Sequence, residues 1–194
     1  MKFRFVLFFV VFALIFSSCK TSSVMVPGEK NLRVQQMYSE YYSIAEEYVK
    51  LENYSKAIEF YEVAMKDKSL YDAAYYKIGQ CYAKNKQYDK AYTVFDTILR
   101  KDPENKSLKN TLAYLTAMNG NVEQAAELYK QILASDPDNA EALVNYVSVL
   151  IILKDYETAK INLSYLEKKY PSTAQIAPLK DNLEKIKDSQ TADK

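Results

Sequence analysis

The chain has 194 residues, with 26 Lys and Arg against 25 Asp and Glu, and no histidine. A balanced charge is not typical of a nucleic-acid-binding protein, so no such partner is expected. Without histidine, the commonest general base and metal ligand is missing, and the acidic residues lie beside lysines in helical surface patterns. We therefore expect no enzyme, no catalytic residue, no metal site and no cofactor. Only 3 Gly and 5 Pro predict a nearly all-helical chain.

Residues 1–18 have the features of a secretory signal peptide. Lys2 and Arg4 precede twelve apolar residues, Phe5 to Phe16, and small polar residues follow. A membrane-spanning helix needs about 20 apolar residues, so this run predicts a cleaved leader and not a membrane anchor.

Cys19 follows this leader in the sequence FSSC. The four residues resemble a bacterial lipobox, where the lipoprotein signal peptidase cleaves before a lipid-modified cysteine. The resemblance implies that Cys19 is the lipid anchor of the mature chain. It also implies an outer-membrane location facing the periplasm. In many lipoproteins an Asp directly after the anchor cysteine keeps the protein in the inner membrane, whereas here that residue is Lys20. The alternative is a soluble secreted protein, cut near Ser22 or Ser23.

Residues 19–37 begin with a polar stretch that predicts a flexible, lipid-anchored tether. The other cysteine, Cys81, lies inside a helical pattern, YYKIGQCYAKN. We expect Cys81 to be a buried packing residue and not the disulfide partner of Cys19.

A repeat of 34 residues dominates the rest of the chain. Alanines recur at this interval, and prolines follow about ten residues after the last three of them: Ala57, Ala91, Ala125 and Ala159; Pro103, Pro137 and Pro171. Each proline stands where a helix has to end, and Asn105 and Asn139 are suited to cap the helix that follows.

This pattern resembles the tetratricopeptide repeat (TPR), a 34-residue helix-turn-helix unit. The resemblance implies an all-α, right-handed superhelix, an α-solenoid, of four repeats: 38–71, 72–105, 106–139 and 140–173. Small residues at the eighth and twentieth positions would let the two helices of a repeat approach, and large ones at the twenty-fourth would fill the seam between them.

The spacing of apolar residues after Pro171 predicts an amphipathic capping helix over 174–188. We expect it to cover an apolar end of the array formed by Val144, Ile151 and Ile152. Residues 189–194 are expected to be a disordered tail.

The resemblance also implies a concave groove lined by the first helices of the repeats. Carried over position by position, the residues expected to bind a partner are Tyr42, Glu46, Lys50, Tyr76, Gln80, Lys84, Asn110, Tyr114 and Met118. The three tyrosines are the principal candidates, because exposed tyrosine offers a large contact area and a hydroxyl at low entropic cost. Packing between repeats is the alternative for each of them.

Two functions follow from these expectations. The first is a non-catalytic scaffold or adaptor, anchored by lipid in the bacterial cell envelope, that binds a peptide or helix of a protein partner in an envelope complex. The second is a soluble secreted or periplasmic protein that binds a peptide or a glycan. The pattern does not indicate an oligomeric state.

Overall fold

The computed structural model describes residues 28–192, with side chains up to residue 186. The predicted leader, Cys19 and the first part of the tether lie outside this range, as do residues 193–194. The chain divides into two units, residues 1–37 and 38–194. Of the first unit, the described part is helical from Glu29 and carries an ion pair between Arg33 and Glu29.

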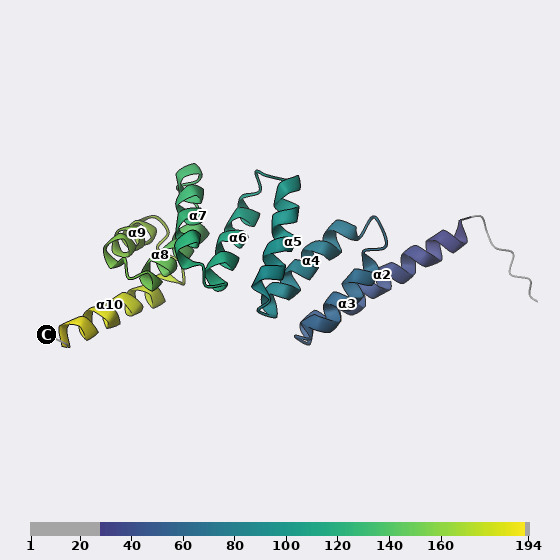
Figure 1. Cartoon of the computed structure of the whole chain (residues 1–194), viewed down its shortest axis with the longest axis horizontal. Helices are drawn as coiled ribbons and strands as arrows, with labels where there is room; N and C mark the ends of the chain where they lie inside the picture. Colours follow the sequence, from purple (N-terminus) through teal and green to yellow (C-terminus); the bar gives the residue numbers. More distant parts are fainter. Residues whose placement is uncertain (1–27, 193–194) are drawn as a thin grey trace, which may run out of the picture. The chain divides into compact units, whose positions relative to one another are not determined.

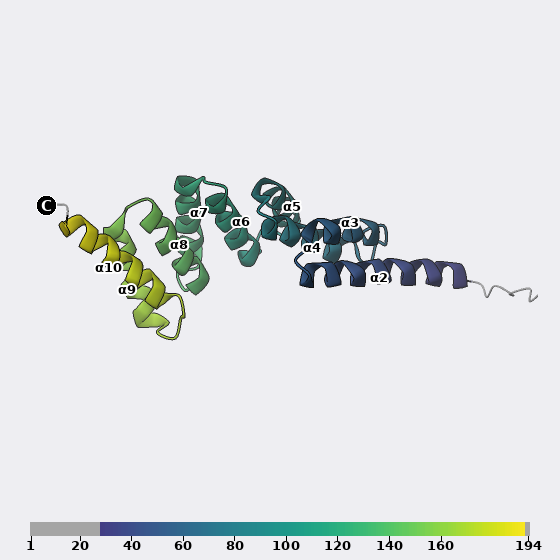
Figure 2. The same cartoon turned by 90° about the horizontal axis from the view of Figure 1, so that it is seen from below.

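The described residues form nine helices and no strand. Within the second unit, successive helices pack against their neighbours in chain order (Figures 1 and 2). The bounds are α2 (Glu29–Lys50), α3 (Tyr54–Ala64), α4 (Tyr71–Lys84), α5 (Tyr88–Lys101), α6 (Lys106–Met118), α7 (Val122–Ser135), α8 (Ala140–Ile152), α9 (Tyr156–Lys169) and α10 (Ile176–Ala192). None of the helices within residues 28–192 is both long and apolar enough to cross a bilayer.

The turn inside each repeat has the same backbone conformation. The fifteenth residue has a positive φ in all four repeats: Glu52 (56°), Lys86 (57°), Gly120 (90°) and Lys154 (62°). In the third repeat, the N–H of Gly120 donates to the carbonyl of Ala117, and the next N–H, of Asn121, donates to that of Thr116. Equivalent bonds close the other three turns. The turn therefore needs a left-handed residue, which glycine adopts at the least cost.

Asparagines cap two of the helices that open a repeat, as the sequence predicts. The side chain of Asn105 accepts a hydrogen bond from the N–H of Leu108, and that of Asn139 accepts one from the N–H of Ala142. Each cap satisfies a backbone donor that the helix itself leaves free.

Small residues hold the two helices of each repeat close together. The side chains at the twentieth position, Ala57, Ala91, Ala125 and Ala159, are all fully buried. Those at the twenty-fourth position are buried beside them: Tyr61, Phe95, Tyr129 and Leu163. The packing predicted from the repeat is therefore present along the whole array.

Helix α10 covers the end of the array, where Ile176, Leu179 and Leu183 join the core formed with α8 and α9. Two expectations need correction. Ile152, at the end of α8, remains 62% exposed, so the cap does not cover it. The helix also continues to Ala192, so residues 189–192 are helical and not a disordered tail.

Helix α2 begins at Glu29. The stretch expected to be a flexible tether, residues 19–37, is thus helical over residues 29–37. The local sequence explains the difference, because EKNLRVQQM consists mainly of good helix formers and has an acidic residue in the first turn.

Candidate functional site

The first repeat is tied to the second by a polar cluster of Tyr61, Glu46 and Lys77. The Tyr61 hydroxyl donates to the Glu46 carboxylate, whose Oε1 lies 3.0 Å from the Lys77 Nζ. Tyr42 lies edge-on against the Tyr61 ring, with the ring centroids 5.2 Å apart. Helices α2, α3 and α4 are thereby joined at one point.

The same contacts explain the pKa values of the cluster. Partial burial pushes the pKa of Glu46 upward, but the hydrogen bonds from Tyr61 and Lys77 outweigh it and leave that pKa below its ordinary value. The bond to Glu46 raises the pKa of Lys77. Burial and the Glu46 charge both raise the pKa of Tyr61. The pair of Glu46 and Lys77 is therefore ionised at neutral pH.

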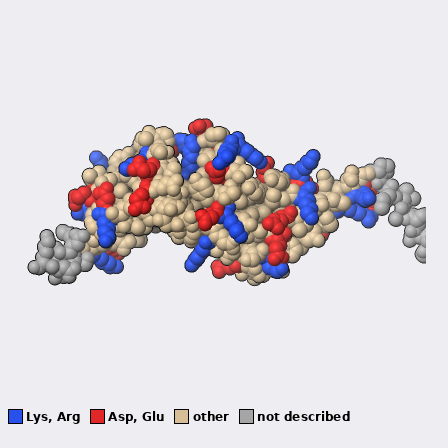
Figure 3. Space-filling model, viewed as in Figure 1, with Lys and Arg blue, Asp and Glu red and all other residues tan. Residues whose placement is uncertain are grey.

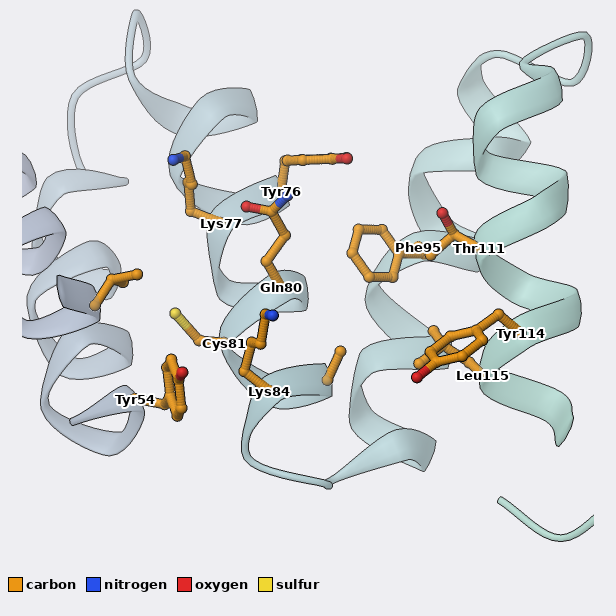
Figure 4. Close-up of a pocket in the computed structure, with 12 residues that line it drawn as sticks. Tyr54, Tyr76, Lys77, Gln80, Cys81, Lys84, Phe95, Thr111, Tyr114 and Leu115 are labelled. Atoms are coloured by element: carbon orange, nitrogen blue, oxygen red, sulfur yellow. The ribbon is translucent and has the colours of Figure 1, made fainter. Parts of the chain in front are cut away.

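Between α4 and α6 the groove opens into a hollow of about 380 Å³, which we call the α4–α6 hollow. Figure 4 shows Phe95 and Tyr114 on one side of it, and Tyr54, Cys81 and Lys84 on the other. Its apolar walls come from four helices: Val49, Cys81, Ala83, Phe95 and Leu115. The volume is at the lower end of the roughly 300–1,000 Å³ range of ligand sites.

Tyrosines and lysines form the rim of this hollow. Tyr76 is 37% exposed and Tyr114 45% exposed, so both present ring surface to solvent. The Tyr76 ring stands edge-on to Phe95 at a centroid distance of 5.4 Å, which fixes its orientation. Lys84 is exposed, and none of the described residues that line the hollow carries a carboxylate. The site thus combines an apolar floor with a basic, aromatic rim.

Cys81 contributes to the wall without being a reactive group. Its side chain is 2% exposed, and burial raises the pKa of its thiol to about 11. It is a free thiol in the structure. The prediction that Cys81 is a buried packing residue is confirmed.

A second hollow of about 490 Å³ lies between α6 and α8 and shares Thr111 and Tyr114 with the first. Glu141 lines it, and no lysine is among the described residues of its lining. The Tyr129 hydroxyl is buried next to the Asn145 amide. Burial, and then the charge of Glu141, raise the pKa of Tyr129, while the Asn145 amide acts in the opposite direction. The two hollows therefore differ in charge.

The structure brings together four of the nine residues predicted to bind a partner. Tyr76, Gln80, Lys84 and Tyr114 line the α4–α6 hollow, and Tyr114 also lines the second one. The other five lie outside its lining: Tyr42, Glu46, Lys50, Asn110 and Met118.

Asn110 is 3% exposed and donates through Nδ2 to Asn139 Oδ1, so it is an internal contact and not a solvent-facing groove residue. Glu46 belongs to the polar cluster with Tyr61 and Lys77, and Tyr42 packs against the Tyr61 ring. Lys50 is exposed and pairs with Glu47 at 2.7 Å. Met118 is 43% exposed and lies outside the lining of both hollows.

Lys77, Thr111 and Tyr54 also line the α4–α6 hollow, although they were not predicted from the sequence as binding residues. Lys77 and Thr111 occupy the sixth position of their repeats, three residues before the ninth and seven before the thirteenth. Residues at these spacings share one face of a helix, so helical periodicity could have indicated them. Tyr54 opens α3, and no spacing rule within the first helices indicates it.

Within residues 28–192, no group of three or more acidic, cysteine or histidine side chains is arranged to hold a metal ion. On the face of the second unit that Figure 3 shows, basic and acidic side chains are interspersed.

Stacked helical hairpins with a hollowed, aromatic-lined inner face define an α-solenoid of the protein-interaction class. A family model described as "Tetratricopeptide repeat" matches residues 48–115 and 117–183, which is more than half of the chain. The chain belongs to the tetratricopeptide repeat family. Proteins of this fold generally serve as non-catalytic scaffolds for protein–protein interaction.

Solved structures agree on the fold. A tetratricopeptide repeat protein from Parabacteroides merdae is 20% identical with a TM-score of 0.64, over 79% of this chain and 61% of that one. This chain therefore spans about three fifths of the Parabacteroides chain. MamA from Desulfovibrio magneticus is 18% identical with a TM-score of 0.60, over 71% of this chain and 77% of that one. A thermophilic TPR protein from Thermus thermophilus is 17% identical with a TM-score of 0.57, over 75% of this chain and 80% of that one. Among curated proteins, none matches the chain significantly in sequence.

Proposed function

We propose that this protein is a scaffold of the bacterial cell envelope, anchored by a lipid on Cys19, that binds a segment of a protein partner in its concave groove. The observation that carries the binding role is the α4–α6 hollow with Tyr76 and Tyr114 at its rim. Both rings remain more than one third exposed although each lies beside apolar surface. Exposed aromatic side chains around a hydrophobic floor are the usual energetic centre of a protein interface.

The envelope location rests on the sequence before the helices. A charged start, a twelve-residue apolar run and the FSSC sequence support export followed by lipidation of Cys19. Lys20 favours the outer membrane, with the repeats facing the periplasm. Partners are then proteins of an envelope complex within reach of that membrane.

Site-specific photo-crosslinking in cells tests the binding role. A photoreactive amino acid replaces Tyr76 or Tyr114, and a control variant carries it at Ile161, which is 69% exposed on α9. We expect the same partner protein to be crosslinked from Tyr76 and Tyr114 and not from Ile161. Equal crosslinking of that partner from all three positions would show that binding does not depend on the groove.

Metabolic labelling with a palmitate analogue tests the anchor. Wild type should take up label and sediment with membranes, whereas Cys19→Ala should be unlabelled. Equal labelling of both proteins would contradict lipidation at Cys19. A soluble, unlabelled wild type would instead support the secreted binding protein.

A further inference from the structure

The first helices of the four repeats are α2, α4, α6 and α8, and three intervals separate them. The residues at two equivalent positions differ from one interval to the next. In the first repeat, the residues at the twenty-fourth and ninth positions are Tyr61 and Glu46, and their hydrogen bond, together with Lys77, links α3 and α2 to α4. In the second repeat these positions hold Phe95 and Gln80, so neither a hydroxyl nor a carboxylate is present to make that link. The α4–α6 hollow is the result, with the Phe95 ring as its apolar wall.

In the third repeat the same positions hold Tyr129 and Tyr114. Here the ninth position carries no carboxylate for the buried Tyr129 hydroxyl to bond, and Tyr114 lines both hollows. The second interval therefore offers an apolar side chain the surface of Phe95 and Leu115, which line the α4–α6 hollow.

The charges around the α4–α6 hollow are not balanced. Glu46 lies 3.0 Å from Lys77 and offsets its charge. Lys84 forms no ion pair with any described carboxylate, and none lines the hollow. On the α8 side, by contrast, the next hollow is lined by Glu141 and by no lysine. A negative group is thus attracted on the α4 side and repelled on the α8 side.

We propose that the α4–α6 hollow binds an extended acidic segment of a protein partner, which places one large apolar side chain against Phe95 and Leu115 and a neighbouring Asp or Glu carboxylate against Lys84. The acidic residue lies on the α4 side of the apolar one, and the residue on the α8 side, near Glu141, is neutral or basic. The inference rests on the proposed function, since it specifies the partner of the same groove.

Peptide selection from a random dodecapeptide phage library tests this specificity. The target is the full-length protein purified from membranes in detergent. We expect the selected peptides to carry a large apolar residue beside Asp or Glu. A fluorescein-labelled peptide with the selected consensus should bind the protein in a fluorescence anisotropy titration.

Charge reversal then identifies the partner of the carboxylate. Lys84→Glu should weaken binding of the consensus peptide about tenfold. The matched control Lys168→Glu, on the exposed face of α9, should leave affinity unchanged. Replacing the acidic residue of the peptide by its amide should weaken binding to wild type and have little further effect on Lys84→Glu, since the interaction is already lost.

Three results would overturn the inference. Selected peptides that are basic, or that bind Lys84→Glu as tightly as wild type, would show that Lys84 does not specify the ligand. If binding of these peptides is still lost in Tyr114→Ala, the groove remains a binding site and the proposed function stands. Peptides insensitive to both Lys84→Glu and Tyr114→Ala, or no enriched peptide, would count against both. A dimer that Tyr114→Ala converts to a monomer would identify a second copy as the occupant.

Discussion

Gly79 offers the sharpest test of how closely the helices pack. It occupies the eighth position of the second repeat, on α4, against α5. A Cβ added there would lie 2.9 Å from Phe95 Cζ, 2.9 Å from Val94 Cγ1 and 3.1 Å from Phe95 Cε1. Since ordinary contact begins at 3.4 Å, the two helices would have to separate by about 0.5 Å.

Two terms decide the effect of Gly79→Ala. Overpacking of a core costs about 1–3 kcal/mol, and alanine gains about 1 kcal/mol over glycine inside a helix. We expect a net loss of about 1 kcal/mol in the free energy of unfolding, measured by urea denaturation and far-UV circular dichroism.

The control for this prediction is the Phe95→Leu background, which removes the ring atoms that the new Cβ would meet. There, Gly79→Ala should cost less than in wild type. If Gly79→Ala instead raises stability by about 1 kcal/mol in wild type, helix propensity alone decides the outcome and the packing argument is refuted.

Three further predictions concern the turns, the polar cluster and the buried thiol. Gly120→Ala should lower the unfolding free energy by about 1 kcal/mol, because residue 120 has a positive φ. Lys86→Gly, at the equivalent turn, should raise the unfolding free energy or leave it unchanged in the same urea assay. A lower unfolding free energy for Lys86→Gly would contradict this account. The lowered pKa of Glu46 means that its stabilising effect is present above the ordinary value of 4.5 and is lost as the pH falls through the folded pKa. Glu46→Gln should therefore lose less stability on acidification than wild type, with Glu59→Gln as an exposed control, and identical pH profiles would disprove the coupling. Cys81, with its thiol pKa raised to about 11, should react with a thiol reagent only after unfolding, and fast labelling of the native protein would contradict its burial.

Much of the fold could be predicted because the repeat constrains local structure and packing together. The alanines at 34-residue intervals all proved fully buried, and Asn105 and Asn139 cap helices as expected. The left-handed turns were less visible, since Gly120 marks one of them while Glu52, Lys86 and Lys154 adopt the same left-handed conformation without glycine. There the hydrogen bonds that close the turn offset the local strain.

The candidate site was predicted only in part, because exposure depends on partners in the neighbouring repeat. Tyr76 and Asn110 occupy the same position in successive repeats. Tyr76 is nevertheless exposed, whereas Asn110 is buried and donates a hydrogen bond to Asn139. Similarly, Glu46 was expected to face a ligand, but its carboxylate accepts a hydrogen bond from Lys77, which lies 31 residues later in the chain.

By itself, the sequence determined the fold class, the period of the repeat, its small packing positions and the burial of Cys81, because each depends on residues close in the chain or on a regular spacing. Only the tertiary structure decided where the groove is open. That depends on whether the side chains of adjacent repeats bond across the interval, as Tyr61, Glu46 and Lys77 do, or line a hollow, as Phe95 and Gln80 do.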